Sequence, residues 1–203
     1  MKSVFDPDYQ NQSIDARIVV AMERLSEAFR TRLWDENKKH NLSPLQIQII
    51  IFLLYHPEQG AGVKQLAGEF NVAKPTASDA VKTLIRKGYL TEEPVATDGR
   101  RKMLKLTPKG EKTAHQVSFF ANRIQDEISP LESGQKKILL ESLLGIIYNL
   151  QQSGIISTDR MCYRCRFFGR SDDPDKPHYC HLLETPLAVA DLRIDCPEFE
   201  PVP

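Results

Sequence analysis

The first forty residues carry apolar positions at the period of an amphipathic helix. Six of them recur at intervals of three and four residues: Ile14, Ile18, Met22, Leu25, Phe29 and Leu33. This spacing places the side chains along one face of a helix. We therefore expect a long helix over about residues 13–40, beginning near Ser13.

A second helix is indicated just after this segment. Ser43 and Pro44 supply a capping hydroxyl and a proline at the first helical position, and the apolar run Leu45–Tyr55 follows directly. We expect this helix to end near His56.

Two shorter helices are predicted next, joined by a tight turn. The break at Gly60–Gly62 precedes residues 63–70, which Asn71 closes as a C-cap. Lys74 opens the following helix, which stops at Gly88. Two helices separated by three or four residues are typical of a helix-turn-helix.

Beyond Gly88 the pattern changes from helical to extended. Met103–Thr107 alternates apolar and polar side chains at period two, and Tyr89–Thr91 supplies a second short extended run. Residues 96–100 carry turn-forming Asp and Gly between them. We expect a two-stranded hairpin, or wing.

Helical spacing returns after residue 111 and continues beyond Pro130. Within Ile138–Leu150 more than half of the positions are large aliphatic residues: Ile138, Leu139, Leu140, Leu143, Leu144, Ile146, Ile147 and Leu150. A stripe this wide exceeds what one neighbour covers, so we expect burial between two subunits. Burial against helices of the same chain is the alternative.

Charge adds a local signal only. The chain has 27 basic and 27 acidic residues, so its net charge gives no argument for nucleic-acid binding. Residues 64–112, however, hold eleven basic against six acidic residues, an excess of five. This indicates a basic field over the predicted helix-turn-helix and hairpin, although an ordinary solvated surface is the alternative.

The apolar runs of the chain are too short for a membrane-spanning helix. The longest, Ile47–Tyr55, is well short of the roughly twenty residues that a membrane helix needs. The first twelve residues are polar and lack the basic and apolar pattern of a secretory signal. We expect a cytoplasmic protein with no membrane partner.

The hairpin carries a recognisable motif. Asp98, Arg100, Leu104, Leu106, Thr107 and Gly110 match the positions of the wing signature of the MarR (multiple antibiotic resistance regulator) family. The helices at 63–67 and 76–90 are similar to the supporting and recognition helices of that family. The chain thus resembles a MarR winged-helix regulator over about residues 14–150.

The resemblance implies a mainly α fold with a small β wing. Residues 1–152 would form the DNA-binding and dimerisation domain, with the winged helix at about 42–110 and dimerisation helices at about 13–40 and 111–152. Residues 153–203 would form a separate cysteine-rich tail. The family works as a homodimer on double-stranded, pseudo-palindromic operators, and small-molecule effectors change the spacing of its DNA-binding lobes.

The recognition helix supplies the first set of candidate DNA contacts. Such a helix enters the major groove with its N-terminal end, where hydroxyl and ammonium groups reach phosphates and base edges. The side chains at those positions are Lys74, Thr76, Ala77, Ser78 and Lys82. Asp79 receives no binding role, because three behaviours stay open for its carboxylate: repulsion of phosphate, reading of the amino group of cytosine, or pairing with Lys82 or Lys74.

The wing supplies the second set. Arg100, Arg101 and Lys102 lie at its tip, where cations are attracted to the narrow minor groove. The resemblance implies that Arg100 inserts into the groove and that Asp98 holds its guanidinium by paired hydrogen bonds.

Four cysteines mark the tail as a candidate metal centre. Cys162 and Cys165 form a C-x2-C pair, and Cys180 and Cys196 follow after intervals of fourteen and fifteen residues. Four thiolates suit tetrahedral Zn²⁺, and thiols of a reducing compartment are more often metal ligands than disulfides. Because Cys196 precedes a proline, an iron–sulfur cluster is the alternative.

The surroundings of the cysteines leave two questions open. His178 and His181 flank Cys180 and would either replace a thiolate or donate a hydrogen bond to one, with a plain surface role as the alternative. The tail would either sense the metal or only be stapled by it. A small core is expected around the site from Phe167, Phe168, Leu182, Leu183, Leu187, Val189, Leu192 and Phe199.

These patterns favour a sequence-specific DNA-binding transcription regulator that acts as a homodimer, with the metal or redox state of the tail as a modulator. No nucleophile elbow, phosphate loop or paired-carboxylate motif occurs, and we expect no enzyme activity. A metal- or redox-dependent enzyme or interaction module on a winged-helix scaffold is the alternative, and a purely structural pair of domains is a third.

Overall fold

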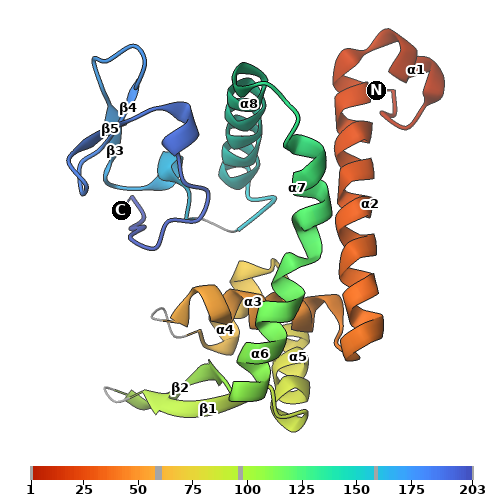
Figure 1. Ribbon diagram of the computed structural model, residues 1–203, viewed down its shortest axis with the longest axis vertical. Helices are drawn as coiled ribbons and strands as arrows, with labels where there is room; N and C mark the ends of the chain where they lie inside the picture. The colour runs from red at the N-terminus through yellow and green to blue at the C-terminus, as the bar shows by residue number, and fades with distance from the viewer. Residues whose placement is uncertain (1, 58–60, 96–97, 158–159, 203) are drawn as a thin grey trace. The chain divides into compact units, whose positions relative to one another are not determined.

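The computed structural model describes residues 2–57, 61–95, 98–157 and 160–202, with the side chains of residues 95 and 98–101 left aside. The fold is mainly helical with a small antiparallel wing, as the sequence predicts (Figure 1). The chain forms two compact units, Met1–Pro57 with Ala80–Glu127, and Glu58–Asp79 with Ile128–Pro203. The predicted division after residue 152 stays a prediction.

The long first helix is confirmed. Helix α2 spans Ile14–His40, and the Ser13 hydroxyl accepts a hydrogen bond from the amide of Ala16 at its start. Asn41 ends it in the left-handed conformation, with φ of 52°. A short helix α1, Pro7–Gln12, precedes it and was not predicted, although the Asp6 side chain caps it in the usual way.

The core of the first unit lies around helix α3, Pro44–Tyr55. Ser43 and Gln46 form a reciprocal capping box at its start, and Ile47, Ile49 and Ile50 are fully buried. Helix α3 packs against α2 and against α6, Pro108–Val117. Burial on nearly every side explains why its sequence is almost continuously apolar.

Helices α4, Val63–Glu69, and α5, Lys74–Arg86, form the predicted helix-turn-helix. The chain reverses at Asn71, which has a φ of 50°, one residue beyond the C-cap of α4. The amides of Asn71 and Val72 donate to the carbonyls of Gly68 and Ala67, which closes the end of α4.

The wing consists of strands β1, Leu90–Val95, and β2, Asp98–Leu106. The strands are antiparallel and pair Leu90 with Leu106 and Glu92 with Leu104. The hairpin between residues 89 and 107 is therefore confirmed over the residues that the structure describes.

The remaining helices are the short 3-10 helix η2, Ser118–Ala121, then α7, Asn122–Ile128, and α8, Ser133–Gln152. On α8, Leu144 is buried and packs with Met161 and Leu192 of the following segment. Burial within the same chain, the alternative interpretation, thus holds for this face of the helix. Ile138 remains 69% exposed, and Leu139 and Ile146 are also exposed.

The tail contains two 3-10 turns, η3 at Cys162–Arg164 and η4 at Val189–Asp191. Its three short strands, β3 at Phe168–Arg170, β4 at His178–Cys180 and β5 at Thr185–Leu187, form an antiparallel sheet in that order.

The expected core of the tail is only partly right. Leu192 is buried and Phe168 and Leu187 are half-buried, but Leu182 and Leu183 are exposed. The tail instead gains its core from α8, because Leu140, Leu144 and Ile147 pack on Met161 and Leu192. Among the described residues, no helix combines the length and apolar character needed to cross a membrane.

Candidate nucleic-acid interface and cysteine pocket

Helix α5 has one buried and one exposed face. Lys74, Thr76 and Lys82 are exposed and Ser78 is half-buried, so these four predicted contacts are accessible from solvent. The buried face is formed by Ala77, Ala80, Val81 and Leu84. Ala77 has an exposed fraction of 0%, so its methyl group belongs to the core and is not accessible for a side-chain contact with DNA.

Of the three cations predicted at the tip of the wing, Lys102 is the one whose side chain the structure describes. Lys102 donates from Nζ to Glu92 Oε2 at 2.6 Å across the two strands, and Lys105 pairs with Glu93 at the same distance. Both pairs are exposed, and such pairs contribute only about 0–1 kcal/mol, so phosphate can replace the carboxylate. The predicted side-chain roles of Asp98, Arg100 and Arg101 lie outside the described residues.

Contacts at the base of the wing hold it against the end of α5. Thr107 donates from its hydroxyl to the Gly88 carbonyl at 2.7 Å. Lys109 donates to the Lys87 carbonyl at 2.7 Å, and its ammonium lies 4.2 Å from the centre of the Tyr89 ring. Sequence analysis gave Lys109 no role, although it stands inside the wing motif.

Gly110 of the same motif has a steric explanation. A Cβ atom built on it would lie 2.0 Å from the carbonyl oxygen of Tyr89, which is backbone and cannot yield easily. The start of α6 and the start of the wing are thus packed as closely as glycine allows.

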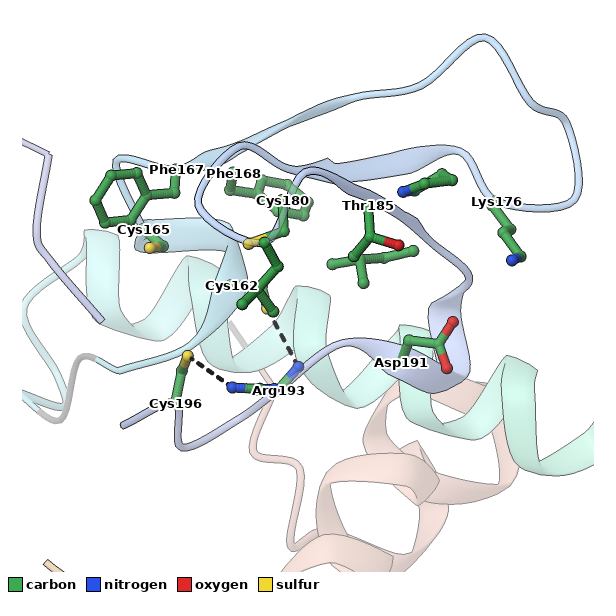
Figure 2. A pocket seen from close by; sticks show the side chains of 13 residues that line it. Cys162, Cys165, Phe167, Phe168, Lys176, Cys180, Thr185, Asp191, Arg193 and Cys196 are labelled. Carbon is green, nitrogen blue, oxygen red and sulfur yellow. Dashed lines mark hydrogen bonds between the residues drawn. The ribbon is translucent and has the colours of Figure 1, made fainter. Parts of the chain in front are cut away.

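The structure brings all four predicted cysteine ligands to one cavity of about 420 Å³, here called the four-cysteine pocket. Its defining residues are Cys162, Cys165, Cys180 and Cys196. Figure 2 shows their side chains around a single hollow, coming from η3, from the end of β4 and from the loop after η4.

Backbone hydrogen bonds fix the pocket's geometry. The amide of Cys165 donates to the Cys162 carbonyl at 2.9 Å, which forms the turn of the C-x2-C pair. The backbone amide of Cys162 donates to the Arg193 carbonyl, and the backbone amide of Cys196 donates to the Arg160 carbonyl, both at 3.0 Å. Residues separated by more than thirty positions are therefore held next to each other without a disulfide.

Arg193 donates to two of the sulfur atoms. Its backbone amide lies 3.2 Å from Cys162 Sγ, and its guanidinium Nη1 lies 3.5 Å from Cys196 Sγ, as the dashed lines of Figure 2 mark. The same Nη1 pairs with Glu198 at 2.7 Å. No sequence motif singled out Arg193, because only the fold shows that it faces the thiols.

Burial raises the pKa of the Cys162 and Cys196 thiols above the ordinary value, and the hydrogen bonds from Arg193 only partly offset this. Both groups are therefore protonated at neutral pH in the metal-free chain. A metal ion binds thiolate, so its binding at this pocket would release protons.

The histidines take no place in the pocket wall. His178 packs against Phe168, with ring centres 5.2 Å apart, and His181 lies over Gly169 and beside Tyr179. The alternative to a ligand role, a surface or stacking role, is the one that these contacts favour. Within the described part of the chain, no three His, Cys, Asp or Glu side chains are grouped closely enough to hold one metal ion.

An ion-pair cluster, here called the α4 clamp, joins the tail to helix α4. It consists of Arg160, Glu69 and Asp195. Arg160 donates from Nη1 and Nη2 to the two carboxylate oxygens of Glu69, each at 2.8 Å, and from Nε to Asp195 at 2.5 Å. The side chains of Arg160 and Glu69 are only 12% and 13% exposed.

Two further contacts strengthen this junction. Asn71 donates from its side-chain amide to the Ile155 carbonyl at 3.2 Å, and the Ser157 hydroxyl donates to the Gly68 carbonyl. The segment before the tail is therefore bonded to the end of α4 and to the turn that leads into α5.

Known proteins share the winged-helix part of this fold. The model of the MarR family matches residues 40–101. Staphylococcus aureus MepR in its DNA-binding conformation superposes with a TM-score of 0.59 at 21% identity, over 66% of this chain and 98% of that one. The MepR–DNA complex gives 0.57 at 22% identity, over 65% and 96%.

A MarR transcriptional regulator from Methanosarcina mazei Go1 gives a TM-score of 0.56 at 20% identity, over 66% of this chain and 96% of that one. The three structures are thus covered almost completely, while about a third of this chain lies outside each match. The chain therefore contains the winged-helix fold of MarR-type regulators, and its residues 40–101 match the model of that family.

Proposed function

We propose that this protein is a sequence-specific DNA-binding transcription regulator that acts as a homodimer. The proposal is carried by the exposed Lys74, Thr76 and Lys82 on α5, whose buried side is formed by other residues of the helix. A helix with this division inserts its polar N-terminal part into the major groove while its apolar side stays in the protein core. MepR, which has the same fold, was solved in complex with DNA.

Exposed apolar side chains support the homodimer. On α2, Ile14, Ile18, Leu25 and Phe29 belong to the predicted apolar stripe and are all exposed in the single chain. On α8, Ile138 and Leu139 are exposed as well. Apolar residues clustered along helices usually mark a surface that a partner covers, and a second copy would give the two-fold symmetry of a pseudo-palindromic operator.

The α4 clamp supports modulation by the tail. The Arg160 carbonyl accepts from Cys196, while the Arg160 side chain holds Glu69 on α4. A change in the four-cysteine pocket would therefore alter a residue that also bonds to the helix-turn-helix. Loss of a metal centre would weaken this junction, and a small-molecule effector remains an additional expectation from the family resemblance.

The test is selection of bound sequences from random double-stranded DNA with the full chain, run with and without a chelator. We expect enrichment of two inverted half-sites about one helical turn apart, and a steep loss of affinity with salt. Absence of any enriched sequence, together with no binding at low ionic strength, would overturn the proposal.

A further inference from the structure

We infer that the four-cysteine pocket binds an iron–sulfur cluster rather than a single zinc ion, with Arg193 donating hydrogen bonds to two of the ligand sulfurs. The inference deepens the proposed function, because it names the centre through which the tail would act. It starts from one fact: all four thiols line a single cavity.

The spread of the thiols is the first argument. A zinc–sulfur bond of about 2.3 Å in a tetrahedral shell puts the four sulfurs roughly 3.8 Å from one another. In the part of the chain that the structure describes, no three potential ligands meet the requirement for one ion, although four cysteines line the same cavity. In an iron–sulfur cluster the four thiolates are divided among two or four irons, so no single ion needs three or more of them.

The size and walls of the pocket are the second argument. The cavity of about 420 Å³ leaves room for an inorganic core larger than one ion. Its walls combine apolar residues with polar ones: Phe167, Phe168, Leu183, Pro186 and Leu187, and Lys176, Thr185, Asp191 and Arg193. The polarity of such a shell influences the reduction potential of an inorganic core.

Hydrogen bonds to sulfur are the third argument. Arg193 reaches Cys162 through its backbone amide and Cys196 through its guanidinium. Such bonds to the ligand sulfurs are among the features that set the potential of iron–sulfur clusters. Cys196 is followed by Pro197, as the last cysteine is in the C-x2-C-x2-C-x3-C-P run of bacterial ferredoxins.

The experiment uses the full chain, purified without oxygen and incubated with ferrous iron and sulfide, and in parallel with zinc alone. We expect a brown protein with iron and acid-labile sulfide in equal amounts, two or four of each per chain. A chain that binds one zinc ion but takes up no sulfide, or that binds neither, would overturn the inference. Because these readouts need no DNA, the inference and the proposed function can fail separately.

Two variants make the assignment residue-specific. Cys180→Ser should lose most of its iron and sulfide. The Arg193→Gln protein should retain iron and sulfide, because the backbone amide of residue 193 is unchanged. The midpoint potential of its cluster should fall, since a cation near the cluster stabilises the reduced form. Arg166→Gln is the matched control: Arg166 pairs with Glu200, and its potential should equal that of the wild type. Equal potentials in all three proteins would overturn the role of Arg193.

Discussion

Arg160 and Glu69 are 91 residues apart in the chain, yet both terminal nitrogens of the Arg160 guanidinium donate hydrogen bonds to the Glu69 carboxylate. The pair has the paired geometry in which arginine binds carboxylates most strongly. Because the side chains of Arg160 and Glu69 are only 12% and 13% exposed, water competes weakly for either charge. The junction between the tail and α4 is therefore specific rather than incidental.

The first prediction concerns this pair. Glu69→Gln should lower the free energy of unfolding by about 3 kcal/mol, because Arg160 then loses the carboxylate that accepts from both of its terminal nitrogens. Denaturant unfolding of the full chain measures this. Operator affinity should fall as well, since α4 leads directly into the recognition helix.

A double-mutant cycle provides the control. The combined variant with Arg160→Gln should cost less than the sum of the two single changes, with a coupling of roughly 1–3 kcal/mol. Simple additivity would show that the contact does not hold the tail to α4.

The second prediction concerns the exposed face of α5. Lys74→Ala should weaken operator binding, because without this ammonium group fewer counterions are released from the DNA phosphates on binding. The slope of log affinity against log salt should fall by about one for each subunit. Lys137→Ala removes a charge from an exposed site on α8 and should leave both affinity and slope unchanged. An unaltered slope in Lys74→Ala would contradict the assigned orientation of α5.

Local signals explain how much of the fold could be predicted from the sequence. The Ser13 cap, the Ser43–Gln46 box and the left-handed Asn71 act within a few residues, so they mark helix ends in the chain itself. Short-range periodicity also indicates that Ala77 is buried. That residue shares its spacing with Ala80 and Leu84, the buried positions of α5, and the recognition-helix assignment alone suggested a DNA contact.

Long-range contacts explain what sequence analysis missed. The α4 clamp and the position of Arg193 depend on residues far apart in the chain, and no local pattern marks them. The four cysteines could be selected because their residue type is rare and chemically specific. Their spread around a cavity of about 420 Å³ required the structure, since spacing in sequence does not give distances between sulfurs.

The third prediction concerns Gly110. Gly110→Ala should destabilise the protein by about 3 kcal/mol, because the new methyl group would collide with the Tyr89 carbonyl oxygen and force the backbone to move. Thermal unfolding measures the effect. Gly134→Ala is a matched control in α8, where a Cβ meets nothing within 4 Å, and it should raise stability by about 0.5–1 kcal/mol. Equal melting temperatures for the two variants would contradict the close approach.

The fourth prediction tests the homodimer through α2. Leu25 is 55% exposed in the single chain and lies in the apolar stripe that we assign to the subunit interface. Leu25→Glu would place a charge without a partner in that interface, so the molecular mass measured by light scattering should fall toward that of one chain. Affinity for the two-half-site operator should fall with it, because one subunit grips only one half-site. Ser26→Glu adds the same charge at the next exposed position and should remain dimeric. A Leu25→Glu protein of unchanged mass and operator affinity would show that this face of α2 lies outside the interface.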